Sequence, residues 1–289
     1  MDDIRRQAHL SGQDLKLLNF KKNSDRFVFR KFYRSGLRSH IFEVLKKDDV
    51  DQESIGVVED GIRVFPRAKP IKIFRIFRRR FGSKAEIFQE IGRYNLLLDY
   101  IGVQFIAPSE EFIADYRDQT GTGRIILCGL QEYVAGQMID PWRLLGPQTI
   151  ASLLSNMGHE LPLDKRIERA MNQIAAFVTG IRRLMAETGY IPDLAGVGNL
   201  ILTPAGGIKL VDINNIVLVN HDKYIHMDDK GYPTCDVSVQ VLSMIEKKIL
   251  GRTDIDSEPV YQLFLKPDRI QQVKKIEQAF FRQLKAANR

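Results

Sequence analysis

The sequence predicts an α+β fold in two lobes, a strand-rich first half and a mainly helical second half. In the first half, short apolar runs are bounded by turn residues, which is typical of strands. In the second half, apolar residues recur every three or four positions over long segments, which is typical of helices. We therefore expect an N-terminal extension over residues 1–50, containing a strand hairpin and a helix, then an N-lobe over 51–133 and a helical C-lobe over 134–289.

The first half begins with an expected hairpin, residues 15–20 and 26–32 around the polar turn 21–25. Residues 37–47 have helical spacing and predict a short amphipathic helix. The next two strands, 54–58 and 62–65, are joined through Asp60-Gly61, a strong hairpin signal. Further strands are expected at 71–77, 103–106, 112–116 and 124–132. Between the first two of these, Ser83 and Glu86 form a capping box that predicts the start of a helix.

The second half contains four segments with helical periodicity and one strand hairpin. The helices are expected at 148–157, 164–187, 236–250 and 267–286. The hairpin consists of 199–202 and 208–213, with Pro204-Ala205-Gly206-Gly207 as its turn.

The composition is that of an ordinary globular protein, with 44% apolar and 27% charged residues. No apolar run reaches the roughly 18 residues that a bilayer span requires. The N-terminus has no signal-peptide pattern, so we expect a cytoplasmic protein. The two cysteines, Cys128 and Cys235, are interpreted as buried apolar residues, and the scattered histidines argue against a zinc hydrolase.

The net charge of +7 is concentrated in the N-terminal part. Residues 1–80 carry 20 Lys plus Arg and 11 Asp plus Glu, a balance of +9, and the remainder carries 23 and 25, a balance of −2. The basic residues peak at Arg75, Arg78, Arg79 and Arg80. These arginines are interpreted either as a solvated element or as a patch for an anionic acceptor or a membrane surface. No nucleic-acid-binding motif accompanies them.

The segment 189–215 carries the most chemical information. Asn199 stands before the hairpin and Asp212 follows its second strand, so the hairpin brings both to one end. Amide and carboxylate oxygens are hard ligands that suit magnesium. Phosphoryl transfer from ATP needs such a metal to neutralise charge.

With its Gly189-Tyr190, Asp193-Leu194, Gly198-Asn199 and Leu210-Val211-Asp212-Ile213 motifs, this segment resembles the protein-kinase-like superfamily. The closest likeness is to bacterial small-molecule and lipopolysaccharide-core kinases. The resemblance implies a bilobal kinase-like fold with ATP and magnesium as cofactors. It implies that Asn199 and Asp212 bind the metal and that Asp193 is the catalytic base.

The resemblance extends over residues 54–250. Residues 131–136 are similar to the hinge that binds adenine, with Glu132 and Val134 supplying backbone groups. Lys72 resembles the phosphate-contacting lysine of the third strand, and Lys31, with Glu43 as its partner, is the competing lysine. Glu90 has the spacing of the helix glutamate that pairs with this lysine. Asp236 resembles an acid buried under the catalytic loop.

Three departures from the family pattern indicate a degenerate kinase. Ile191-Pro192 replaces the His-Arg that precedes the base, and Asn199 lies six rather than five residues after Asp193. The turn before Lys72 is Glu59-Asp60-Gly61, whose carboxylates would repel a triphosphate. We therefore expect a pseudokinase that binds nucleotide and magnesium between two lobes. The alternatives are an active phosphotransferase for a sugar, glycolipid or protein hydroxyl, and a basic adaptor.

Overall fold

The computed structural model describes residues 3–7, 9–18, 26–32, 36–117 and 123–287. The fold is mixed α+β, as predicted. The chain divides into two compact units. Unit 1 comprises Met1–Ile91 and Pro108–Tyr133, and unit 2 comprises Gly92–Ala107 and Val134–Arg289.

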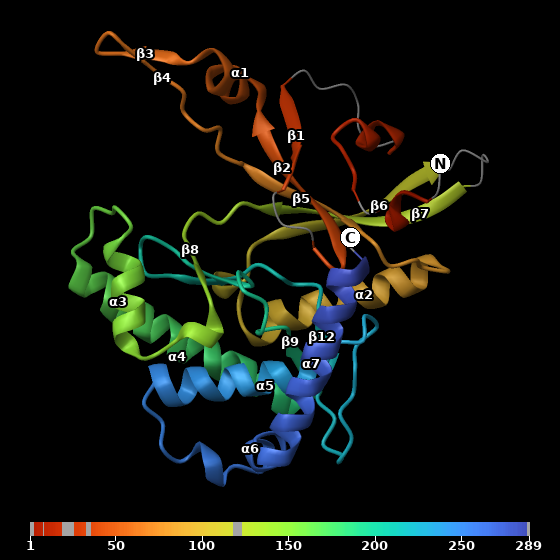
Figure 1. The fold of residues 1–289 in the computed structure, drawn as a ribbon, viewed down its shortest axis with the longest axis vertical. Coiled ribbons are helices and arrows are strands. Elements are labelled where there is room, and N and C mark those ends of the chain that lie inside the picture. Colours follow the sequence, from red (N-terminus) through yellow and green to blue (C-terminus); the bar gives the residue numbers. More distant parts are fainter. Residues whose placement is uncertain (1–2, 8, 19–25, 33–35, 118–122, 288–289) are drawn as a thin grey trace. The chain divides into compact units, whose positions relative to one another are not determined.

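Unit 1 is built on a five-stranded antiparallel sheet (Figure 1). Its strands, in spatial order, are β1 (Phe27–Lys31), β2 (Ser39–Lys46), β5 (Lys72–Phe77), β7 (Gly123–Glu132) and β6 (Ser109–Arg117). β1 and β2 therefore belong to this sheet, and residues 1–50 are not an extension outside the N-terminal unit. The expected helix over 37–47 was wrong, because β2 occupies that stretch. The expected strand at 15–20 falls partly on the short helix η2 (Asp14–Leu17), and 19–25 lie outside the described residues.

The two faces of this sheet are covered by different segments. The face bearing Phe42, Phe74 and Ile76 is packed by apolar residues of the N-terminal segment, and we call it the N-terminal face. The segment contains η1 (Ile4–Arg6) and η2, and the packing residues are Ile4, Leu10, Leu15 and Leu18. The face bearing Phe77 and Leu127 is packed by Ile87 of α2 (Lys84–Tyr100), and we call it the helix face.

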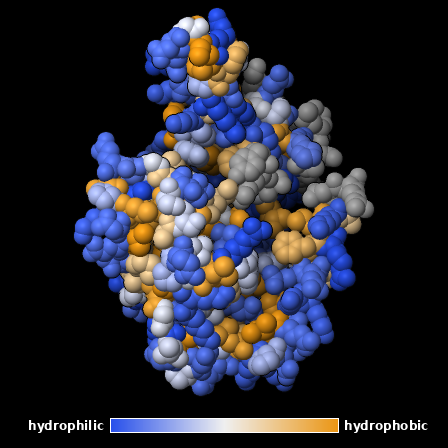
Figure 2. Space-filling view, turned by 60° about the vertical axis from the view of Figure 1, so that its left-hand side comes forward, coloured by the Kyte–Doolittle hydropathy of each residue, from blue (hydrophilic) through white to orange (hydrophobic). Residues whose placement is uncertain are grey.

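Between β2 and β5 the chain inserts α1 (Lys47–Ile55) and a separate hairpin of β3 (Val57–Glu59) and β4 (Ile62–Val64). Both turn residues have positive φ, 49° at Asp60 and 78° at Gly61, as the predicted two-residue turn requires. The projecting hairpin carries exposed apolar side chains among charged ones, visible at the top of Figure 2. They include Val58, Ile62 and Phe65. The acidic turn is thus part of an appendage outside the main sheet.

Unit 2 is mainly helical, and α4 (Leu163–Thr188) is its central helix. The other helical segments are η3 (Val103–Phe105), η4 (Pro141–Arg143), α3 (Pro147–Ser155), α5 (Thr234–Met244), the π-helical η5 (Ile245–Ile249), η6 (Ile255–Ser257), α6 (Pro259–Phe264) and α7 (Pro267–Ala287). Gly180 allows α4 to approach the end of α2, since a Cβ there would lie 2.8 Å from the Cα of Ile101. Among the described residues, no helix combines the length and apolar composition that a bilayer span requires.

Two small sheets complete unit 2. One is formed by β11 (Ile208–Leu210), β10 (Leu200–Leu202) and β8 (Gln137–Ile139), and the other by β12 (Ile216–Leu218) and β9 (Tyr190–Pro192). The predicted hairpin is confirmed, because Leu200 pairs with Leu210 and Leu202 with Ile208.

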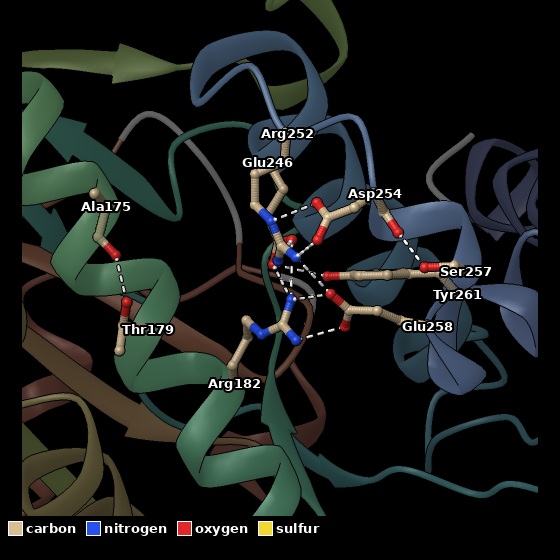
Figure 3. Close-up of polar contacts among 9 residues, drawn as sticks. All are labelled: Ala175, Thr179, Arg182, Glu246, Arg252, Asp254, Ser257, Glu258 and Tyr261. Carbon is tan, nitrogen blue, oxygen red and sulfur yellow. Dashed lines mark hydrogen bonds and ion pairs between the residues drawn. The ribbon is translucent and has the colours of Figure 1, made fainter.

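A polar network connects α4 to the segment that follows α5 (Figure 3). The Glu246 carboxylate is fully buried and accepts hydrogen bonds from Arg182, Arg252 and the Tyr261 hydroxyl. Both arginines also bond Glu258. Burial, together with the Glu246 charge, raises the pKa of Tyr261. The buried acid is therefore well compensated.

Candidate functional site

Two loops of unit 2 come together where the small sheets end. The first loop follows β9 and the second precedes β12, and these strands pair with Pro192 opposite Ile216. The pairing continues one residue further, since the Asp193 N–H donates to the Asn215 carbonyl at 2.8 Å. Upstream, Gly189 is the C-cap residue of α4 and has a φ of 72°. The backbone N–H of Gly189 donates to the Met185 carbonyl. This local geometry fixes where both loops start.

The carboxylate of Asp193 is held by hydrogen bonds on both oxygens. Oδ1 accepts from the backbone N–H of Ala195 at 2.9 Å, and Oδ2 accepts from Nδ2 of Asn215 at 3.0 Å. Hydrogen bonds to both oxygens fix the direction of the carboxylate. The Asp193 carboxylate is therefore held in one orientation, which suits either a catalytic base or a structural hydrogen-bond acceptor.

Asn199 is fixed to the loop that begins at Asp193. Its Nδ2 donates to the Asp193 backbone carbonyl at 3.0 Å, and its own carbonyl accepts from the Val211 N–H at 2.8 Å. With the amide nitrogen donating to this carbonyl, Oδ1 is the side-chain atom that could accept a metal or a further hydrogen bond. Gly196 leaves the room for this arrangement, because a Cβ there would lie 2.5 Å from the Asn199 Oδ1.

Asp212 follows Val211 directly, so it stands one residue past the position paired with Asn199. Its Oδ1 accepts from the Asn214 N–H at 3.4 Å. The structure thus brings Asn199 and Asp212 to the same end of the β10–β11 hairpin. Within the described residues, no group of three His, Cys, Asp or Glu is arranged to hold a metal. An amide and a carboxylate fit magnesium, which keeps several waters and takes phosphate oxygens as further ligands.

The support beneath the first loop differs from the expectation for Asp236. Asp236 is buried but forms an ion pair with Arg269 of α7, whose Nη1 also donates to the Asp222 carbonyl at 2.9 Å. The loop is instead bonded by Ser238 of α5, whose hydroxyl accepts from the buried Leu194 N–H at 3.2 Å. The sequence did not indicate this role of Ser238, which lies two residues after Asp236 in the same helix.

Both cysteines are buried, as predicted from their number and spacing. Burial raises the pKa of the Cys235 thiol to about 12 and also raises that of Cys128. Thiols with such raised pKa values are poor nucleophiles and metal ligands.

In unit 1 the structure separates Lys72 from Glu90. Lys72 alternates with Phe74 and Ile76 and so lies on the N-terminal face, whereas Glu90 belongs to α2 on the helix face. Glu90 forms an ion pair with Arg79 at 2.9 Å. The predicted partner of the competing Lys31 is also engaged elsewhere, since Glu43 pairs with Arg30 at 3.2 Å.

The charged residue of β5 that points to the helix face is Arg75. It is buried, and its Nη2 donates to Glu111 at 2.6 Å and to Ser109 at 2.9 Å. The alternation of residues 72–77 predicts that Lys72 and Arg75 point to opposite faces of the strand. It does not predict which of the two faces α2 covers.

The predicted hinge residues lie at the boundary of the two units. β7 ends at Glu132, whose N–H donates to the Pro108 carbonyl at 2.9 Å. Val134 is the first residue of the second part of unit 2, and β8 starts three residues later. The Glu132 N–H is thus already used within unit 1.

The four arginines interpreted as an anion patch are held by intramolecular contacts. Arg75 bonds Glu111, Arg79 bonds Glu90, and Arg80 bonds Asp3 at 3.0 Å. Arg78 is half-buried and donates to the Gln7 carbonyl at 3.3 Å. Three of the four arginines are thus paired with internal acids, whereas Arg78 contacts a backbone carbonyl.

The side chain of Trp142 lies beside the loop that begins at Asp193. Trp142 is 40% exposed, and its Nε1 donates to the Ala195 carbonyl at 3.2 Å. Asp140 caps the short helix η4 that positions it, accepting from the Trp142 N–H. An exposed indole is thus fixed two residues beyond Asp193.

This chain resembles a known protein over part of its length. No family model matches the chain. The chain is similar to Protein HesA of Leptolyngbya boryana, with 28% identity over 107 residues. The match covers 37% of this chain and spans about a third of that protein, 34% of its length.

Proposed function

We propose that this chain is a degenerate protein-kinase-like protein that binds a nucleotide with magnesium and transfers phosphate slowly or not at all. The observation that carries the proposal is the arrangement in unit 2. Asn199 is tied to the Asp193 carbonyl and directly paired with the residue before Asp212. An amide oxygen and a carboxylate near one hairpin end are the kind of ligands that magnesium bound to a phosphate chain takes, and this supports the proposal.

The bilobal kinase-like fold is part of the same proposal. Two features support it: an antiparallel five-stranded sheet whose third and fourth strands in chain order are separated by α2, and a helical unit interrupted by the β10–β11 hairpin. Loss of efficient transfer is supported by unit 1, where Lys72 lies on the face opposite α2 and Arg75 is engaged by Glu111. An arginine held by a buried acid is a poor substitute for a mobile phosphate-contacting lysine.

The first experiment is a thermal-shift titration of the full chain with ATP, with and without magnesium. We expect magnesium to increase the stabilisation by ATP, since a ligand that binds only the folded state raises the melting temperature. Asp212→Ala should remove the magnesium-dependent part of the shift. The exposed Asp164→Ala is the matched control and should retain it. An unchanged shift in Asp212→Ala would exclude Asp212 from the site, and no shift in the wild type would overturn the proposal.

An active ATP-dependent phosphotransferase is the second candidate, favoured by the orientation of Asp193. A carboxylate held on both oxygens is suited to accept the proton of an acceptor hydroxyl. ATP consumption that requires a sugar, glycolipid or protein acceptor and disappears in Asp193→Asn would establish this alternative. Binding without consumption would support the pseudokinase.

A further inference from the structure

Three basic side chains gather at one end of the N-terminal face of unit 1. Lys31 of β1 pairs with Phe42, and His40 of β2 pairs with Ile76, so both lie on the face that Phe42 and Ile76 occupy. Arg78 follows β5 in the same alternation, and its N–H donates to the Arg38 carbonyl at 2.9 Å. The three side chains thus come from three adjacent strands.

These groups are close to one another and withdrawn from solvent. Nη2 of Arg78 lies 3.4 Å from Nδ1 of His40, which is fully buried. Nζ of Lys31 lies 5.1 Å from the centroid of the Phe42 ring. This ammonium is shielded from solvent and has no hydrogen-bond partner among the residues that the structure describes. A buried ammonium without an anion is costly, so the lysine requires a compensating ligand.

The acids of this region are already used by other cations. Asp3, on the N-terminal segment, bonds Arg5 at 2.7 Å and Arg80 at 3.0 Å. Glu43 points to the opposite face and pairs with Arg30. Neither Asp3 nor Glu43 is therefore available to neutralise Lys31.

The protonation states agree with the geometry. Burial, and then the Arg78 charge, lower the pKa of Lys31. Burial also lowers the pKa of His40 to about 3, with contributions from Arg78 and Lys31, so its ring is neutral and acts by hydrogen bonding. A ligand with negative charge would reverse the unfavourable interaction for all three groups.

We propose that Lys31, His40 and Arg78 form a binding site for a small oxyanion of the phosphate or sulfate class. Guanidinium and ammonium groups together recognise such an anion through charge-assisted hydrogen bonds. The site lies entirely within unit 1 and shares no residue with the Asn199–Asp212 pair of unit 2. It therefore stands or falls independently of the proposed function.

The test measures thermal stability of the full chain in inorganic phosphate, without magnesium, against chloride of equal ionic strength. The wild type should melt roughly 3 °C higher at a phosphate concentration ten times Kd. Lys31→Met should melt higher than the wild type in chloride, because the buried charge is gone, and should lose the phosphate response. The exposed Lys69→Met is the control and should respond like the wild type.

Calorimetric titration with inorganic phosphate provides the second measurement and should give one site per chain, absent in Lys31→Met. AMP without magnesium distinguishes the source of the anion: competition with phosphate would show that the phosphoryl group of a nucleotide is accepted, and its absence would restrict the site to the free ion. Phosphate also stabilises proteins without binding a site. Equal shifts in the wild type and Lys31→Met, with no calorimetric binding, would overturn the proposal.

Discussion

Gly196 is required at the candidate metal site because there is no room for a larger side chain there, and not because of an unusual backbone angle. A Cβ at this position would lie 2.5–2.7 Å from three atoms of the Asn199 side chain. Contacts this short force one group to move. Because the Asn199 amide is held by the Asp193 carbonyl, its displacement would also release the loop.

We predict that Gly196→Ala reduces the magnesium-dependent part of the ATP-induced thermal shift at least several-fold, because Asn199 is pushed from its position. Gly92→Ala is the matched control: it lies in α2 with open space around its Cβ position and should stabilise the protein by about 0.5–1 kcal/mol while keeping the ATP response. The thermal-shift titration described above measures both. A normal ATP response in Gly196→Ala would show that Asn199 does not bind the metal.

His40 makes stability depend on pH. Its pKa in the folded chain is about 3, below the usual value of about 6.5, because it is buried beside Arg78 and Lys31. The unfolded chain therefore takes up a proton that the folded chain does not, and stability falls as pH drops below about 6.5. We predict a loss on the order of 1–2 kcal/mol between pH 8 and pH 5, measured by urea unfolding.

His40→Gln should remove most of this loss, whereas the exposed His159→Gln should leave it unchanged. If His40→Gln showed the same pH dependence as the wild type, the shifted pKa of His40 would not be its source.

At the scale of elements, β2 shows why periodicity misleads in a sheet. Its buried residues belong to both faces of the strand, and the N-terminal segment covers one of these faces. Strict alternation is lost in such a strand, and the remaining apolar spacing of Leu37, Ile41, Val44 and Leu45 matched a helix. The helix α1 was not predicted, because it has no buried residue and therefore no apolar stripe.

The elements that were predicted well have local signals. The Asp60-Gly61 turn, the cap in which Ser83 accepts from the Glu86 N–H, and the β10–β11 hairpin each depend on residues close in sequence. Asn199 and Asp212 were brought together for the same reason. The positions of Lys72 and Glu90 depend on which face of the sheet α2 covers, and this is decided by contacts distant in sequence.

The network around Glu246 provides a prediction about how elements are held together. Glu246→Gln would remove one of the two carboxylates that Arg182 and Arg252 share, and Glu258 would remain (Figure 3). We expect a loss of about 1.5–3 kcal/mol in the free energy of unfolding, because hydrogen bonds to a buried charged group are lost. Chemical denaturation would measure it.

Asp256→Asn is the control for this substitution, since its pair with Lys247 is exposed and should contribute less than about 1 kcal/mol. A loss for Glu246→Gln no larger than that of the control would show that the network does not stabilise unit 2.

At the scale of the whole molecule, the sequence predicted a change of character after residue 133, and the structure divides there as well. It did not predict that residues 92–107 belong to unit 2. The apolar spacing of α2 is continuous, so nothing local marks the point at which its partners change. Ile87 packs in unit 1, whereas Leu97 and Ile101 belong to the core of unit 2.

The chain therefore crosses from one unit to the other three times, after residues 91, 107 and 133. An expression fragment ending at residue 133 would carry Tyr94, Leu97, Ile101, Phe105 and Ile106 without the core in which they are buried. The complementary fragment would lack these five interior side chains. Dividing the polypeptide after residue 133 would therefore leave both fragments with an incomplete core. Single substitutions in the intact polypeptide are the better way to test its parts.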